Sequence, residues 1–291
     1  IGEGSALTLT AQALQNSAGQ ISLQGAGVLT LTADLLSNTS GAQLIADNTL
    51  ALNVGVLTQE ESTLYGKAID LTGQSISNLG GRIEGETVVI TLSDYLRNGA
   101  RNDIDGQLLA TSQAADSLSL AIEGLLDNRS GRISSNSRAL TLQAGNLNNA
   151  LGQIVQAGDG TWQINTNTLD NSEGVIGTNA ALEINATSLI NDQGVLRSAK
   201  AASLNVADDL SNTNGSLLIN GRLTLAANSL DKSHGELQAL GEGDTSLVVS
   251  GAIVNAQGKI ETNSQNLRLD AESVSNTDGG LIKQTGVGSL N

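Results

Sequence analysis

The sequence contains no cysteine, proline, phenylalanine or methionine, and its only large aromatic residues are one tryptophan and two tyrosines. Without cysteine the chain can form neither a disulfide nor a thiolate metal site, and one histidine cannot make a histidine metal site. The lack of cysteine also suits a chain that crosses an oxidising periplasm unfolded. We therefore expect a core of leucine, isoleucine, valine and alanine.

Positive charge is also scarce: 14 Lys and Arg stand against 29 Asp and Glu, a net charge of −15. No Lys/Arg cluster is present, so we expect no nucleic acid and no anionic lipid as partner. The sequence has no signal-peptide core and no apolar run long enough to span a bilayer, which argues against direct membrane insertion. Because it starts at Ile1 without methionine, we expect it to be an internal piece of a longer protein.

What the sequence does contain is one motif, repeated from end to end. Its clearest copy is 182–196, which reads L-x-[LI]-x-A-x-x-L-x-N-x-x-G-x-[IL]. We call the place of its asparagine the ladder position. This position recurs about every 21 residues, a period typical of solenoids, and predicts a single repeat domain over residues 1–291. The thirteen residues at the ladder position are Asn16, Asn38, Gln59, Asn78, Asn98, Asn128, Asn149, Asn171, Asn191, Asn212, Lys232, Asn255 and Asn276.

A glycine follows the ladder position by three residues in eleven of the thirteen copies, and Ser62 and Arg101 are the exceptions. Glycine takes positive φ without steric cost, so we expect it to make the turn. Asparagine can bond neighbouring backbone, and stacked asparagines can bond one another in a ladder. Gln59 and Lys232 should then be the weak rungs. The predicted structural turn pairs are Asn16 and Gly19, Asn38 and Gly41, Asn78 and Gly81, Asn128 and Gly131, Asn149 and Gly152, Asn171 and Gly174, Asn191 and Gly194, Asn212 and Gly215, Asn255 and Gly258, and Asn276 and Gly279.

The segment before each ladder position alternates apolar and polar residues, as in Leu140-Thr-Leu-Gln-Ala144, which predicts a strand with leucine inward. A second short strand follows the glycine, and a third surrounds the leucine two residues before the asparagine. Three strands and three turns per copy predict an all-β parallel β-helix of about 13 coils of about 21 residues. A leucine-rich repeat has its leucines and asparagine in a different order, and a helical repeat needs apolar residues three and four apart.

One copy is longer than the rest, and its extra residues predict a loop insertion at about 98–110. Asp103 and Asp105 in this loop, or Glu60 and Glu61 in the turn that lacks glycine, are the candidates for calcium binding. Neither pair fits a spaced calcium loop or the glycine-rich calcium roll. We therefore expect no cofactor and no metal site.

The motif resembles the filamentous haemagglutinin repeat, with Leu126-Asp-Asn-Arg-Ser-Gly-Arg-Ile133 and Leu169-Asp-Asn-Ser-Glu-Gly-Val-Ile176 as its clearest matches. The resemblance covers essentially the whole chain. It implies a right-handed parallel β-helix in a large exoprotein of Gram-negative bacteria, exported through an outer-membrane two-partner-secretion transporter to the cell surface or beyond. Such proteins are adhesins, or toxins of contact-dependent growth inhibition that carry the repeat as a stalk. The family's secretion domain carries Asn-Pro motifs, which a chain without proline cannot contain. No segment here departs from the repeat to form a receptor-binding domain, so host or bacterial receptors are expected to bind other regions.

The remaining alternative is a polysaccharide-degrading enzyme, since many of these enzymes are parallel β-helices. They need clustered carboxylates on one face and aromatic residues on which sugar rings stack. Here the aromatics, Tyr65, Tyr95 and Trp162, are few and far apart, and the charged residues are scattered. His234 lies within a turn and has no identifiable catalytic partner. The sequence therefore predicts no catalytic residue and favours a shaft over an enzyme. We expect the shaft of an adhesin, with the stalk of a contact-dependent growth inhibition toxin as the alternative that the sequence leaves open.

Overall fold

The computed structural model describes residues 5–288, and these residues contain strands and turns but no helix. They fold as a parallel β-solenoid of about 13 turns, which confirms the predicted fold class and excludes a helical repeat. The chain divides into two compact units, Ile1–Leu147 and Asn148–Asn291, and we describe each by itself.

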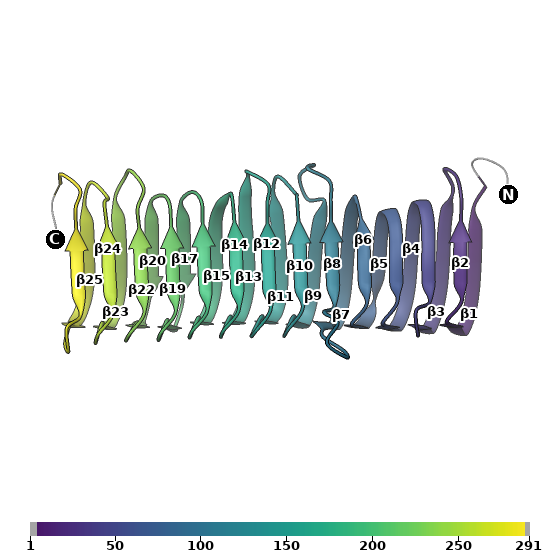
Figure 1. Ribbon diagram of the computed structural model, residues 1–291, viewed down its shortest axis with the longest axis horizontal. Helices are drawn as coiled ribbons and strands as arrows, with labels where there is room; N and C mark the ends of the chain where they lie inside the picture. Colours follow the sequence, from purple (N-terminus) through teal and green to yellow (C-terminus); the bar gives the residue numbers. More distant parts are fainter. Residues whose placement is uncertain (1–4, 289–291) are drawn as a thin grey trace. The chain divides into compact units, whose positions relative to one another are not determined.

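In the first unit, purple to teal in Figure 1, strands from successive coils lie side by side. The strands are β1 (Leu7–Ser17), β2 (Gln20–Leu23), β3 (Val28–Thr39), β4 (Gln43–Glu60), β5 (Thr63–Leu79), β6 (Arg82–Gly85), β7 (Thr87–Gly99), β8 (Gln107–Ala110), β9 (Leu118–Asp127), β10 (Arg132–Ser135) and β11 (Leu140–Asn148).

The second unit repeats this arrangement with shorter strands. They are β12 (Gln153–Gln156), β13 (Thr161–Asp170), β14 (Val175–Thr178), β15 (Ala181–Ile190), β16 (Val195–Ser198), β17 (Ala202–Val206), β18 (Asp209–Ser211), β19 (Ser216–Ile219), β20 (Leu223–Ala227), β21 (Ser229–Asp231), β22 (Glu236–Ala239), β23 (Thr245–Val254), β24 (Lys259–Thr262), β25 (Leu267–Ser275) and β26 (Leu281–Gln284).

Equivalent residues of neighbouring coils pair in parallel register. Ile164 pairs with Ile184, and Leu169 pairs with Leu189, between β13 and β15. Because the register keeps leucine over leucine, each coil buries its aliphatic residues against equivalent residues of the next. The alternation predicted from the sequence is present: in β11, Leu140 and Leu142 are buried while Thr141 is exposed.

The three short strands expected in each coil are often joined. In the first unit β4 runs for 18 residues and β5 for 17, each through more than one side of the coil. Glycines allow the bends between sides, because a Cβ on Gly73 would lie under 3.0 Å from the carbonyl oxygen of Val54. The chain therefore changes direction there while parallel pairing continues.

Candidate functional site: the asparagine corner and the lateral hollows

The ladder position forms a buried column of hydrogen-bonded amides at one corner of the coil. In the second unit, the Nδ2 of Asn149 donates to Oδ1 of Asn171 at 2.7 Å, Asn171 donates to Asn191 at 2.6 Å, and Asn191 donates to Asn212 at 2.6 Å. All four side chains are fully buried. Each Nδ2 also approaches the carbonyl of the glycine three residues later, at 3.3 Å for Asn171. One amide thus closes its own turn and joins the next coil.

The first unit contains the same column in two pieces. Asn16 donates to Asn38 and Asn38 donates to Gln59, both at 2.8 Å. Asn78 donates to Asn98 and Asn98 donates to Asn128, both at 2.7 Å.

Between these pieces the rung from Gln59 to Asn78 is missing. Gln59 accepts from Asn38, but its own Nε2 is directed to the carbonyl of Arg82, at 3.5 Å. As a result the buried Oδ1 of Asn78 has no hydrogen-bond partner. The extra methylene of glutamine keeps the acceptor in place and moves the donor away, so the hydrogen bond is lost at one of the two rungs that the sequence predicted to be weak.

Lys232 interrupts the column in the opposite way. Its Nζ donates to Oδ1 of Asn255 at 2.7 Å and to the carbonyl of Gly235 at 3.0 Å, and the side chain is fully buried. An ammonium group has no acceptor, so it cannot receive the amide of Asn212. Burial lowers the pKa of Lys232 from 10.5 to about 8, and the charge of Glu236 opposes this shift.

The turn after the ladder position differs from the one that we expected. The residue with positive φ is the one before the glycine, for example Glu173 (55°), Gln193 (57°) and His234 (58°). The glycine is needed for a different reason. A Cβ on Gly194 would lie under 3.0 Å from the carbonyl oxygen of Asn171 in the preceding coil, and would also meet Oδ1 of Asn191 at 2.8 Å.

Two of the predicted glycines do take positive φ, Gly41 (78°) and Gly279 (89°), and nothing lies near the place of their missing Cβ atoms. These turns are one residue longer. The residue packed at the corner is therefore the next one, buried Ala42 in one turn and Gly280 in the other. At Asn276 the Nδ2 accordingly reaches the carbonyl of Gly280, four residues on.

Ser62, one of the two exceptions, does occupy the glycine place. It is buried, and its Oγ donates to the carbonyl of Asn38 at 2.6 Å. The other exception, Arg101, does not, because Gly106 takes the corner after the inserted residues. Gly106 accepts from the backbone N–H of Arg132, and Gln107 donates to Gly81, which places it between the corner glycines of its neighbours.

In two of the three copies that have aspartate before the ladder position, Asp170 and Asp231, this aspartate closes a local turn. Oδ1 of Asp170 accepts from the backbone N–H and the hydroxyl of Ser172, at 2.9 and 2.6 Å. Asp231 makes the same two bonds with Ser233. This local turn orients the chain as it leaves the strand, so the aspartates support the corner.

The insertion predicted at about 98–110 is smaller than expected. Residues 100–105 form a projecting hairpin near the end of β7 (Figure 1), and residues 107–110 are strand β8. Arg101 and Ile104 exchange two backbone hydrogen bonds, of 2.8 and 2.9 Å, around Asn102 and Asp103. Both central residues have positive φ, 51° and 61°, as in a type I′ turn. The rest of the extra length lies in the connection between β8 and β9.

The hairpin folds over the turn that contains the two glutamates considered for calcium. Arg101 Nη1 lies 3.1 Å from Glu60 Oε2, its Nε lies 3.7 Å from Glu61 Oε1, and Asn102 also donates to Glu61. Within residues 5–288, no three acidic or histidine side chains gather in a way that could hold a metal ion. These glutamates instead attach the hairpin to the coil.

The chain matches a known protein family. The model described as "Haemagglutinin repeat" matches residues 1–54, 111–172, 155–214, 203–260 and 243–288, which together cover most of the chain. The chain belongs to the haemagglutinin repeat family. No curated protein and no solved structure matches it.

Haemagglutinin repeats form β-helical shafts of secreted, adhesin-like proteins, and two-partner secretion is the context that they suggest. The family is typically structural rather than enzymatic. No helix among the described residues is long and apolar enough to cross a membrane. The matched segments leave out residues 55–110, which contain Gln59, Ser62 and the hairpin. The Lys232 departure, by contrast, lies inside a matched segment.

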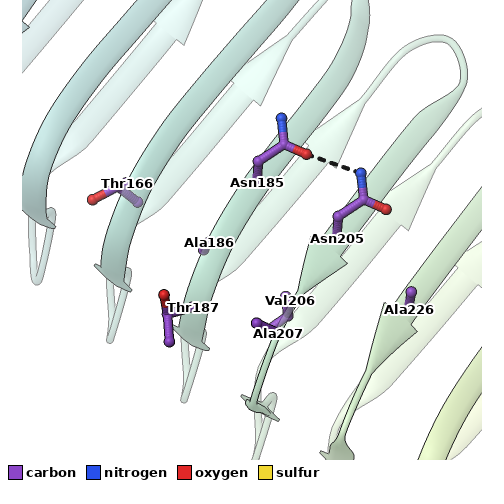
Figure 2. A pocket seen from close by; sticks show the side chains of 8 residues that line it. All are labelled: Thr166, Asn185, Ala186, Thr187, Asn205, Val206, Ala207 and Ala226. Carbon is purple, nitrogen blue, oxygen red and sulfur yellow. Dashed lines mark hydrogen bonds between the residues drawn. The ribbon is translucent and has the colours of Figure 1, made fainter.

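Shallow hollows lie on the sides of this haemagglutinin repeat. The one in Figure 2 has a volume of about 390 Å³ and lies across β13, β15, β17 and β20. Asn205 Nδ2 donates to Asn185 Oδ1, and Asn185 donates to Asn165, both at 2.9 Å, which makes a second, outer amide row along its edge. Threonine, alanine and valine side chains complete the lining, and none of the lining residues is titratable. Sequence reasoning missed this row, although Asn165, Asn185 and Asn205 share one register.

Several ionic groups near the end of the second unit form ion pairs. Lys259 lies 3.3 Å from Glu236 and 2.6 Å from Glu261, and Lys283 lies 3.0 Å from Glu261. Hydrogen bonds from both lysines lower the pKa of Glu261, and its bond to Lys259 raises the pKa of that lysine. His234 is exposed in its turn.

Proposed function

We propose that the chain is part of the shaft of a large secreted or cell-surface adhesin, which presents distal binding regions away from the cell. The observation that supports this most strongly is the corner. The same buried amide, the same packed glycine and the same three strand directions recur in coil after coil, so added coils give length and leave the cross-section unchanged.

The proposal includes the route of export and the continuity of the shaft. An outer-membrane two-partner-secretion transporter passes the chain unfolded, which a sequence without cysteine permits. Residues 1–291 then fold as one continuous haemagglutinin-repeat domain outside the cell. Receptors, on host or bacterial cells, bind regions other than this one.

The experiment is to change the number of coils in the complete exported protein while leaving everything else intact. If the chain is a spacer, removing two or three whole repeats reduces attachment to target cells, and inserting as many consensus repeats restores it. The purified 291-residue chain should itself not compete for attachment. Competition by the purified chain, or attachment independent of coil number, would contradict the shaft.

The same assay separates the alternative, a stalk of a contact-dependent growth inhibition toxin. A stalk predicts that shortening reduces killing of neighbouring bacteria, whereas an adhesin shaft predicts reduced attachment with no killing to lose. In both cases the chain acts through its length.

A further inference from the structure

The hairpin of residues 100–105 lies across the gap between the two pieces of the amide column in the first unit. The missing rung is the one from Gln59 to Asn78. The hairpin follows Asn98, the ladder residue of the next coil, and it contacts the turn after Asn78 and also the turn after Gln59. The inserted residues therefore touch both coils that the missing rung would have joined.

The first contact is with the turn after Asn78. Gly80 in this turn has a φ of 62°, and a Cβ there would lie 3.2 Å from Cβ of Arg101 and 3.4 Å from the carbonyl oxygen of Ile104. The backbone N–H of Gly80 donates to the carbonyl of Gly99 at 2.9 Å. The hairpin backbone thus lies directly on this turn, and a side chain at residue 80 would push it away.

The second contact reaches one coil further. Arg101 Nη1 lies 3.1 Å from Glu60 Oε2, and its Nε lies 3.7 Å from Glu61 Oε1. Asn102 also donates to Glu61, and these two residues are 41 positions apart in the sequence, about two repeats. Two coils span about 10 Å, which an arginine on a projecting hairpin can cross. These bonds therefore pass over the coil of Asn78.

We infer that this hairpin is an ionic strap, which holds the coils of Gln59 and Asn78 together in place of the missing side-chain rung and releases them when salt weakens its ion pairs. The two coils still pair through their backbones, and the N–H of Glu61 donates to the carbonyl of Leu79 at 3.0 Å. The strap adds a connection from outside at the corner where the buried one is lost. Gln59, the glutamate turn and the hairpin also share the segment, residues 55–110, that the family model leaves unmatched.

The strap should respond to salt because its charges are accessible to solvent. The side chain of Arg101 is 44% exposed, and those of Glu60 and Glu61 are 25% and 33% exposed. Exposed ion pairs are weak, and they are screened as the Debye length falls from about 10 Å at 0.1 M salt to about 3 Å at 1 M. This corner of the first unit is then a joint whose opening depends on ionic strength, a property that goes beyond the proposed role as a shaft.

The first test is hydrogen exchange of the 291-residue chain, measured by mass spectrometry at about 20 mM and about 500 mM sodium chloride. Peptides covering residues 57–66 and 76–83 should exchange roughly three- to fivefold faster at the higher concentration. The turns after Asn171 and Asn191, where the rungs are present, are the control. Salt also screens the repulsion within an acidic chain, so exchange there should be unchanged or slower. Equal acceleration at all these turns, or none at the strapped corner, would contradict the inference.

The second test removes the strap's charge. Arg101→Gln should speed exchange of the same two peptides roughly three- to fivefold at low salt and should abolish their salt dependence. The matched control is Arg268→Gln, because Arg268 pairs with Asp270 within the single strand β25 and joins no coils. It should leave residues 57–83 unchanged, and circular dichroism must show that both variants keep the fold. An Arg101→Gln variant that exchanges like the unchanged chain would overturn the strap.

The third test restores the buried rung instead. Gln59→Asn supplies a short amide that can donate to Oδ1 of Asn78, so adding it to Arg101→Gln should return exchange at this corner to about the rate of the unchanged chain. If the double variant still exchanges as fast as Arg101→Gln alone, the hairpin holds only its own turn and does not replace the rung. The shaft proposal does not depend on this result, because coil number and the strap are varied independently.

Discussion

At the scale of the residue, the ladder position requires one short side chain that carries both a donor and an acceptor. Asparagine meets this requirement, and the two substitutes each keep one half of it. Gln59 retains the acceptor and loses the donor to Asn78, whereas Lys232 retains the donor and has no acceptor for Asn212. The first change leaves the buried Oδ1 of Asn78 without a partner, and the second buries a charged group, so both coils should be locally less stable than their neighbours.

Lys232→Asn should complete the column between Asn212 and Asn255. We expect the free energy of unfolding at pH 7 to rise by roughly 2 kcal/mol, because the change removes a buried charge and adds a rung. Urea unfolding followed by the emission of Trp162 measures this, since Trp162 is the only tryptophan and is fully buried in the same unit. A variant no more stable than the unchanged chain would show that the column contributes little.

The same lysine gives the second unit a dependence on pH. Its folded-state pKa of about 8 lies below the ordinary 10.5, so between these values the unfolded chain binds more protons than the folded one. The free energy of unfolding of the unchanged chain should therefore rise with pH across this window, by on the order of 2 kcal/mol between pH 7 and 9.5. Well below pH 8 Lys232 is protonated in both states, so it should add no further dependence of stability on pH. Lys232→Asn should lose this rise. If the stability of the unchanged chain and of the Lys232→Asn variant rose equally with pH, titratable groups other than Lys232 would be responsible for the rise.

Substitutions at two adjacent turn residues, Gln193 and Gly194, should differ strongly in their effect on stability. Gly194→Ala inserts a methyl group against the carbonyl of Asn171, and we expect a loss of roughly 3 kcal/mol as the coils move apart. Gln193→Gly removes a side chain from a residue with a φ of 57°, and should change stability by at most about 1 kcal/mol, in either direction. Thermal unfolding of the two variants compares them. Similar losses would mean that the turn conformation, rather than coil contact, fixes the glycine.

The sequence predicted the amide column because its members share one residue type at one spacing. It could not show which turn residue takes positive φ, because that place holds Ala18, Ser130, Glu173, Gln193 and His234, which have no common chemistry. In all of these turns except that of Ala18, the glycine that follows is packed against the preceding coil. That contact between coils is invisible in a single copy of the motif.

At the scale of the element, the hairpin at 100–105 can be separated from the coil that carries it. Deleting residues 101–105 leaves Asn98-Gly-Ala-Gly106, which is the N-x-x-G spacing of the other corners. We expect the circular dichroism to be unchanged and the stability to fall by less than about 1 kcal/mol, because the lost ion pairs of Arg101 are at the surface. Deleting five residues from the buried strand pattern, 194–198, is the control and should unfold the coil. Equal damage from both deletions would make the hairpin part of the fold.

The alternation of leucine with polar residues predicted that each coil contains strands, but it did not predict how long the strands are. β4 and β5 are long because parallel pairing continues through bends where glycines such as Gly55 and Gly73 approach the backbone of the previous coil. The sequence motif assigned no role to these two glycines, because they lie before the ladder position and not after it. The hairpin was likewise predicted as a loop of unknown shape, because a type I′ turn built on Asn102 and Asp103 lacks the usual glycine.

At the scale of the whole molecule, the haemagglutinin repeat makes each coil depend only on its neighbours, so a complete coil should be removable. Deleting residues 191–211 joins Ile190 to Asn212 and recreates the sequence L-x-N-x-x-G across the junction. Leu189 and Leu210 occupy equivalent places, as their direct pairing shows, so the shortened chain presents the same surface to the coils on either side. The amide of Asn171 then donates to Asn212 in place of Asn191.

We expect this deletion to fold with unchanged circular dichroism per residue, and to lose only the contribution of one coil and one interface, roughly 1–3 kcal/mol. Removing residues 191–200, about half a coil, should instead misalign every later strand, because leucines meant for the interior would face solvent. Hydrogen exchange measured by mass spectrometry distinguishes the two outcomes coil by coil. If the whole-coil deletion disrupts protection as widely as the half-coil deletion does, the molecule is not modular, and length could not be varied freely in the way that a shaft requires.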